Sequence, residues 1–277
     1  MPRPDPHRAR PDPSRLSLNT ATVKQQWNLA QTIDGCARHG IRGISPWRDK
    51  VAEMGVKKAA AAIRANGLTV TGLCRGGFFT SPDFLSDNLR AIEEARELGA
   101  QCLVLVVGGL LPGTKDLIFS REKVLEGIAT ILPEARKANV PLAIEPLHPM
   151  QAADRACINT LEHALDICDA LGDGIGVAVD VYHVWWDPKL KAQIERAGKE
   201  RILAYHICDW RRDTRDLLND RGMMGDGVID LPRIRGWVEG AGYAGFHEVE
   251  IFSTLDWWRR DPDEVLQVMK ARHRAAS

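Results

Sequence analysis

Long apolar runs are missing from this sequence. No segment reaches about 18 consecutive apolar residues, the lower limit for a helix that crosses a bilayer. The opening stretch MPRPDPHRARPDPSR is rich in Pro, Arg and Asp and lacks the apolar run of a secretory signal. We therefore expect a cytoplasmic protein with no membrane partner, in which residues 1–15 are a disordered tail and residues 16–277 form one domain.

An excess of charge of one sign is also missing. The 37 basic and 37 acidic residues cancel at neutral pH. Proteins that track a phosphate backbone carry an excess of positive charge, which this composition does not supply. We expect no nucleic-acid partner.

Paired cysteines are the third absence. The six cysteines are spread along the chain without a C-x-x-C pair. This spacing is typical of reduced thiols and does not indicate a disulfide framework or a zinc ribbon.

The sequence does contain a regular alternation of β-rich and helical runs. The β-rich runs are 16–23, 41–47, 68–77, 101–109, 141–147, 176–183, 202–210 and 246–252. The helical patterns are 29–40, 49–66, 86–99, 120–138, 160–171, 189–198, 231–241 and 261–274. Eight βα units with right-handed crossovers close into a barrel of roughly 250 residues. We predict an α/β fold with a single (β/α)8 TIM barrel. An open doubly wound sheet would need a Gly-rich turn where this chain has Asn19-Thr20-Ala21.

Ionisable residues stand near the ends of the last four β-rich runs. These are Glu145, Asp180, His206 and Glu250. Barrel chemistry lies at the carboxyl ends of the strands, and period-two alternation points the first three side chains toward the barrel axis. Leu203 and Tyr205, on either side of Ala204, would face the helices.

A cation is the simplest reason for such a cluster. Any one of these residues alone would be explained by a salt bridge, but three carboxylates and an imidazole that converge repel each other without a cation. Oxygen-rich ligation favours Mn²⁺, with Mg²⁺ and Co²⁺ close behind and Zn²⁺ still open. We expect Glu248 to point inward beneath the metal and to accept a hydrogen bond from a metal ligand, a rim salt bridge being the alternative.

The motifs IEP, VDVYH, AYHICDW and HEVEIF resemble the xylose isomerase-like TIM barrel superfamily over residues 16–275. That superfamily includes sugar phosphate isomerases and epimerases, ketose 3-epimerases and inosose-processing enzymes. The resemblance implies Glu145, Asp180, His206 and Glu250 as metal ligands, with the two glutamates as catalytic proton-transfer groups. It also implies substrate binding by His183 and Arg212, and a homo-oligomer.

Two departures from the ketose epimerases leave the substrate open. Gln151 stands where those enzymes carry a substrate-binding glutamate, and the loop DWRRDTRDLLNDRGMMGDG is longer and more charged. Its arginines, Arg211, Arg212 and Arg215, either hold a phosphate or form an exposed charged loop.

Two reactions fit this arrangement. Glutamates from strands three apart in a ring of eight suit epimerisation of a small carbohydrate, a keto-sugar or keto-inositol, through a metal-stabilised enediolate. β-Elimination from a 3-keto-glycoside starts with the same proton loss, and His148, Tyr182 or His183 would then protonate the leaving oxygen. Trp185 and Trp210 are candidates for stacking on the sugar, although packing explains each one equally well.

Two other classes have weaker support. An AP-type endonuclease needs additional histidines near the third and fourth strands, where GLCRGG and LVVGG have none. A carbohydrate-binding barrel without catalysis remains open because fold alone does not define function.

Overall fold

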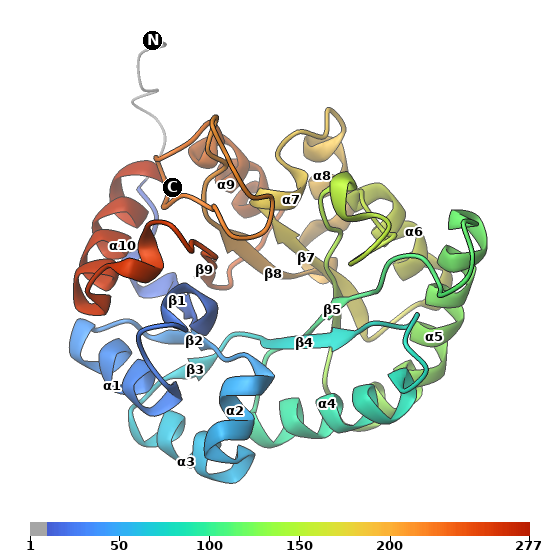
Figure 1. The fold of residues 1–277 in the computed structure, drawn as a ribbon, viewed down its shortest axis with the longest axis horizontal. Helices are drawn as coiled ribbons and strands as arrows, with labels where there is room; N and C mark the ends of the chain where they lie inside the picture. The colour runs from blue at the N-terminus through green and yellow to red at the C-terminus, as the bar shows by residue number, and fades with distance from the viewer. Residues whose placement is uncertain (1–9) are drawn as a thin grey trace.

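The computed structural model describes residues 10–277 (Figure 1). Pro13–Arg15 form a short 3-10 helix, η1, in which the Asp12 side chain accepts a hydrogen bond from the Ser14 amide at 2.8 Å. The predicted tail is therefore wrong for these last residues, and residues 1–9 lie outside the described part of the chain.

Nine parallel strands form the barrel, in the order β3-β2-β1-β9-β8-β7-β6-β5-β4. They are β1 (Leu16–Asn19), β2 (Gly43–Ser45), β3 (Thr69–Val70), β4 (Leu73–Gly77), β5 (Leu103–Val106), β6 (Leu142–Ile144), β7 (Ile175–Asp180), β8 (Ile202–Ile207) and β9 (His247–Val249). The predicted third strand, 68–77, is divided in two. Its first part pairs with β2 and its second with β5, so this one stretch of chain joins the two ends of the sheet. The predicted TIM barrel is confirmed.

Helices surround the barrel on its outside (Figure 1). They are α1 (Leu29–His39), α2 (Arg48–Met54), α3 (Val56–Ala65), α4 (Phe84–Leu98), α5 (Leu117–Lys137), α6 (Leu161–Leu171), α7 (Val181–Val184), α8 (Leu190–Arg201), α9 (Leu231–Gly240) and α10 (Pro262–Ala276). The predicted helix 49–66 is broken at Gly55, whose φ of 84° few other residues adopt. Within residues 10–277 we find no helix with the length and apolar character needed to cross a membrane.

Two apolar layers follow from strand alternation. The outward-facing layer packs with the helices and includes Leu142, Ile144, Val177 and Val179. The layer inside the barrel consists of small residues and includes Ala143, Ala178, Ala204, Cys74, Cys102 and Val104. Tyr205 faces outward as expected, but Leu203 packs against the inner layer. The reason is a register shift: Val177 pairs with Ile202 and Ala178 with Ala204, which leaves Leu203 unpaired in a bulge.

Candidate metal centre and substrate cavity

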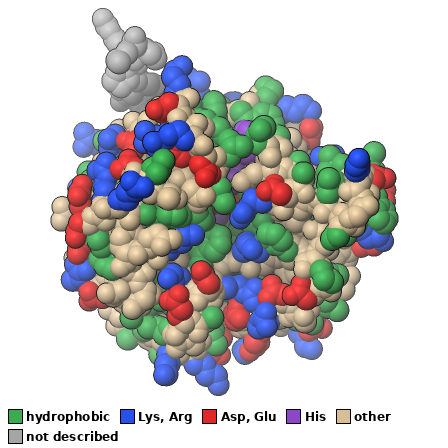
Figure 2. All heavy atoms as spheres, in the orientation of Figure 1, with side chains coloured by type: hydrophobic (Ala, Val, Ile, Leu, Met, Phe, Trp, Pro, Cys, Tyr) green, Lys and Arg blue, Asp and Glu red, His purple; other side chains and the backbone are tan. Residues whose placement is uncertain are grey.

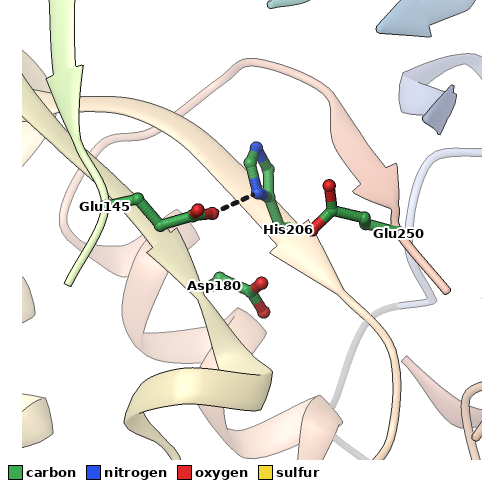
Figure 3. Close-up of side chains that lie close together, drawn as sticks. All are labelled: Glu145, Asp180, His206 and Glu250. Atoms are coloured by element: carbon green, nitrogen blue, oxygen red, sulfur yellow. Dashed lines mark hydrogen bonds and ion pairs between the residues drawn. The ribbon is translucent and has the colours of Figure 1, made fainter. Parts of the chain in front are cut away.

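Glu145, Asp180, His206 and Glu250 meet at the carboxyl ends of the strands (Figure 3). All four are buried, and one ligand atom from each lies within 4.8 Å of the others. Asp180 ends β7 and pairs in register with His206 on β8, while Glu145 and Glu250 follow β6 and β9. The structure thus brings together the four residues that the sequence singled out as metal ligands.

Asp180 also starts a helix. The predicted strand 176–183 stops at this residue because the chain turns into α7, where the Asp180 Oδ1 accepts the Tyr182 amide at 2.8 Å. This N-cap fixes one carboxylate oxygen. The other oxygen, Oδ2, accepts a hydrogen bond from Arg221 Nη1 at 3.1 Å.

Glu248 points into the barrel under these residues. Its Oε1 accepts a hydrogen bond from Asn19 Nδ2 at 2.8 Å and its Oε2 one from Thr71 Oγ1 at 2.9 Å. The Oε1 also lies 3.4 Å from His206 Nε2, off ideal hydrogen-bond geometry. The geometry therefore holds Glu248 beside the imidazole and does not place it in a rim salt bridge.

The orientation of His206 fits a metal ligand. Its Nδ1 lies 2.9 Å from Glu145 Oε1 within the cluster (Figure 3). Its Nε2 lies 3.4 Å from Glu248 Oε1. When the Nε2–H faces a carboxylate, the imidazole keeps its proton on Nε2, and the Nδ1 lone pair is free to bind a cation. Three carboxylates and one neutral imidazole suit a divalent ion.

Burial shifts the pKa of two groups in the cluster. Desolvation raises the pKa of Glu145 to about 7, although its hydrogen bond to His206 opposes this. Burial alone would lower the pKa of His206, but the negative charges of Glu248 and Glu145 raise it well above its ordinary value. A metal-free centre therefore holds protons that a cation would displace.

Arg221 is a site residue that sequence reasoning missed. Its Nη1 donates to Asp180 Oδ2 and Glu250 Oε2, both at 3.1 Å, and its guanidinium lies 4.4 Å from the centre of the Tyr182 ring. No spacing rule pointed to it, because it sits in the long loop after β8. Asn19 was also missed: it donates to Glu248 and, at 3.0 Å, to Glu250, and its place at the end of β1 was the available signal.

Asp209 holds that loop in place. Its carboxylate accepts four backbone N–H groups, from Trp210, Gly225, Gly227 and Ile229, at 2.8 to 3.0 Å. The Arg221 amide donates to the Phe252 carbonyl at 2.9 Å, which ties the loop to the chain after β9. Arg221 is therefore presented by a well-anchored segment.

Arg212, to which the resemblance gives a substrate-binding role, is exposed on the same loop and is not among the residues that line the cavity. Arg221 lies beside the cluster. Arg211 lies 3.6 Å from Asp256, and Arg215 pairs with Asp220 at 2.9 Å. Arg211 and Arg215 therefore each have a carboxylate partner within the protein.

His183 lines the cavity, whereas His148 contacts His183 and does not line it. The His183 ring has a donor at each nitrogen: the His148 amide lies 3.1 Å from Nδ1 and Arg221 Nη2 lies 3.2 Å from Nε2, which is also 3.6 Å from Asp180 Oδ2. Burial lowers the pKa of His183 to about 3, which keeps the ring neutral. The His148 ring instead stacks on Trp210, with centroids 4.9 Å apart.

Trp185 and Trp210 form an aromatic cluster outside the cavity wall. Trp210 packs on Tyr182, with ring centroids 4.7 Å apart, and Trp185 lies 5.9 Å from Trp210. The Tyr182 hydroxyl donates to the Leu217 carbonyl at 3.0 Å, so its proton is already engaged. Trp47 and Phe252 supply the aromatic wall of the cavity instead.

A cavity that opens to solvent lies over the cluster. Its polar lining consists of Glu145, Glu250, His183, Gln151, Arg75, Arg155 and Arg221. Figure 2 shows histidine atoms in a hollow of the surface, with basic side chains beside it. This is a setting for a small polar molecule.

The family model for the xylose isomerase-like TIM barrel matches residues 33–271. The chain belongs to this family. Inosose isomerase of Bacillus velezensis is 23% identical over 92% of this chain and 94% of that protein. Among solved structures, protein SMc04130 of Sinorhizobium meliloti 1021 is 58% identical, with a TM-score of 0.94 over 96% of this chain and 99% of that one. The IolI protein, crystallised with zinc, has a TM-score of 0.78 at 21% identity over 93% and 96% of the chains, a likeness of fold.

Proposed function

We propose that this protein is a divalent-metal-dependent isomerase or epimerase of a keto-sugar or keto-inositol. The observation that carries the proposal is the buried cluster of three carboxylates and one imidazole facing a small polar cavity. The relationship to inosose isomerases supports the choice of substrate class.

Glu145, Asp180, His206 and Glu250 would hold the ion. A bound divalent cation polarises a carbonyl and stabilises the negative charge that develops when an adjacent C–H proton is lost. Mn²⁺ is our expectation from the oxygen-rich ligand set, and the zinc in IolI makes Zn²⁺ the first alternative to test.

The remaining roles follow from the side chains that line the cavity. Glu145 and Glu250 both border it and enter from different strands, so one accepts the proton and the other returns it. His183 borders the cavity and would contact a substrate oxygen. Arg221 holds Glu250 and Asp180 in position through its two hydrogen bonds.

The test is deuterium exchange in D₂O with protein loaded with Mn²⁺ or Zn²⁺. Ketoses and inososes should gain deuterium next to the carbonyl, as read by NMR, and Glu250→Gln should abolish exchange while Glu162→Gln, an exposed control, should not. 3-Keto-glycosides belong in the same panel, since release of an aglycone would reveal elimination in place of epimerisation. Absence of exchange with every keto-sugar and both metals would reject the proposal.

A further inference from the structure

Two arginines line the cavity outside the metal cluster. Arg75 belongs to β4, and Arg155 lies in the segment between β6 and α6. Both are half-buried. They border the same space as Glu145 and Glu250, so a molecule bound at the cluster lies within reach of both.

Neither guanidinium has a protein partner within residues 10–277. Neither forms an ion pair or donates a hydrogen bond there, and Arg75 Nε is buried with no acceptor. The Arg75 guanidinium lies over the Phe78 ring, 3.8 Å from its centre. By contrast, the comparably buried Arg48 pairs with Asp87 and Glu94.

The positive charges of Arg75 and Arg155 also repel each other. Burial and the neighbouring Arg155 lower the pKa of Arg75 to about 10, so it remains charged at neutral pH. A half-buried pair of like charges without a counter-ion is unfavourable for folding, and such pairs occur where a ligand supplies the opposite charge.

Two uncharged polar groups at the cavity also have no hydrogen-bond partner within residues 10–277. They are Trp47 Nε1, a donor, and Gln151 Oε1, an acceptor. The carboxylates that share the cavity are engaged elsewhere: Glu145 with His206, and Glu250 with Asn19 and Arg221.

We propose that Arg75 and Arg155 bind an anionic group of the substrate, a carboxylate or a phosphate ester. The substrate is then a keto-sugar acid or a keto-sugar phosphate and not a neutral sugar, with its carbonyl at the cluster and its anion at the arginine pair. Both ends of such a molecule would lie in one cavity, because the arginine pair and the two glutamates of the cluster line the same space. This inference rests on the proposed function, whose substrate class it narrows.

Anion binding tests the pair without catalysis. Inorganic phosphate and acetate would be titrated calorimetrically into the Mn²⁺-loaded protein. We expect Arg75→Met and Arg155→Met each to weaken binding of the preferred anion about tenfold or more, since charge-assisted hydrogen bonds are lost. Arg75→Lys and Arg155→Lys should recover part of the affinity.

Arg64→Met is the matched control, because Arg64 is exposed near the end of α3, away from the cavity. Unchanged anion affinity in both methionine variants would overturn the inference. Loss of Mn²⁺ together with the anion would also count against a separate anion subsite.

A matched substrate panel separates this inference from the proposed function. Deuterium exchange would be compared for fructose, fructose 6-phosphate and fructuronate. Faster exchange with one anionic sugar supports the inference and identifies phosphate or carboxylate. Exchange with fructose alone overturns it and leaves the proposed function intact. Absence of all exchange, with anion binding lost in the arginine variants, rejects the function and keeps the subsite.

Discussion

Removal of the Arg221 guanidinium should lower activity and leave metal binding intact. Its guanidinium is within 3.1 Å of Asp180 and Glu250, two of the proposed ligands. We expect Arg221→Met to lower kcat in the exchange assay about 100-fold or more, because Glu250 loses the donor that orients it. Mn²⁺ affinity should stay equal or tighten, because a positive charge beside the ion is removed. Weaker Mn²⁺ binding, measured by titration, would contradict this role.

Glu248 supports the imidazole without lining the cavity. We predict that Glu248→Gln weakens metal affinity about 10- to 100-fold, since outer carboxylates hold metal-ligating histidines in position. Competition with a fluorescent chelator would measure the change, and exposed Glu162→Gln would serve as the control. An unchanged affinity would mean that Asn19 and Thr71 alone explain why Glu248 is buried here.

At the scale of elements, Gly77 lets β4 approach β5. Its φ is 104°, and a Cβ at this position would lie 2.1 Å from the Val106 carbonyl oxygen. We expect Gly77→Ala to lower the free energy of unfolding by about 2–4 kcal/mol, measured by urea denaturation. Gly236→Ala within α9, where no atom lies within 4 Å of the new Cβ, should be stabilising by about 0.5–1 kcal/mol. Equal effects of the two changes would refute the steric argument.

Elements were predictable from sequence to different degrees. The strands and their inward residues follow from local alternation, which is why Glu145, Asp180 and His206 could be placed. The bulge at Leu203 depends on pairing with β7, and the position of Arg221 depends on a loop fixed by Asp209. Such long-range contacts leave no periodic trace in the sequence, so both features emerged only with the structure.

For the whole molecule, the metal-free state should lose stability as pH rises. Folding raises the pKa of Glu145 from 4.5 to about 7, so the folded chain binds more protons than the unfolded chain between these values. The raised pKa of His206 acts in the same direction above its unfolded value. The slope should not exceed about 1.4 kcal/mol per pH unit for each group. Urea denaturation of chelator-treated protein from pH 5 to 8 measures this dependence of the free energy of unfolding on pH. The Glu145→Gln variant should show a weaker dependence. A free energy of unfolding that increases with pH would contradict the prediction.

Metal should reverse that trend. An ion that binds only the folded chain stabilises it by about 2.7 kcal/mol at 100 times its Kd. Because protons on Glu145 and His206 compete with the ion, Mn²⁺ should raise Tm more at pH 8 than at pH 5. Thermal unfolding with and without EDTA at the two pH values provides the check, and an equal shift at both would show that these groups do not titrate with metal binding.

Asp209 anchors the loop after β8. This anchoring affects how the loop could change between related barrels. Asp209 and the four amides that it collects make the segment up to Ile229 a self-contained unit, and Arg221 is carried within it. Exchange of that unit during evolution, or by grafting in the laboratory, would replace Arg221 at the cavity and leave Glu145, Asp180, His206 and Glu250 in the chain. Under the proposed function, substrate selectivity and metal binding would then be inherited separately in this scaffold.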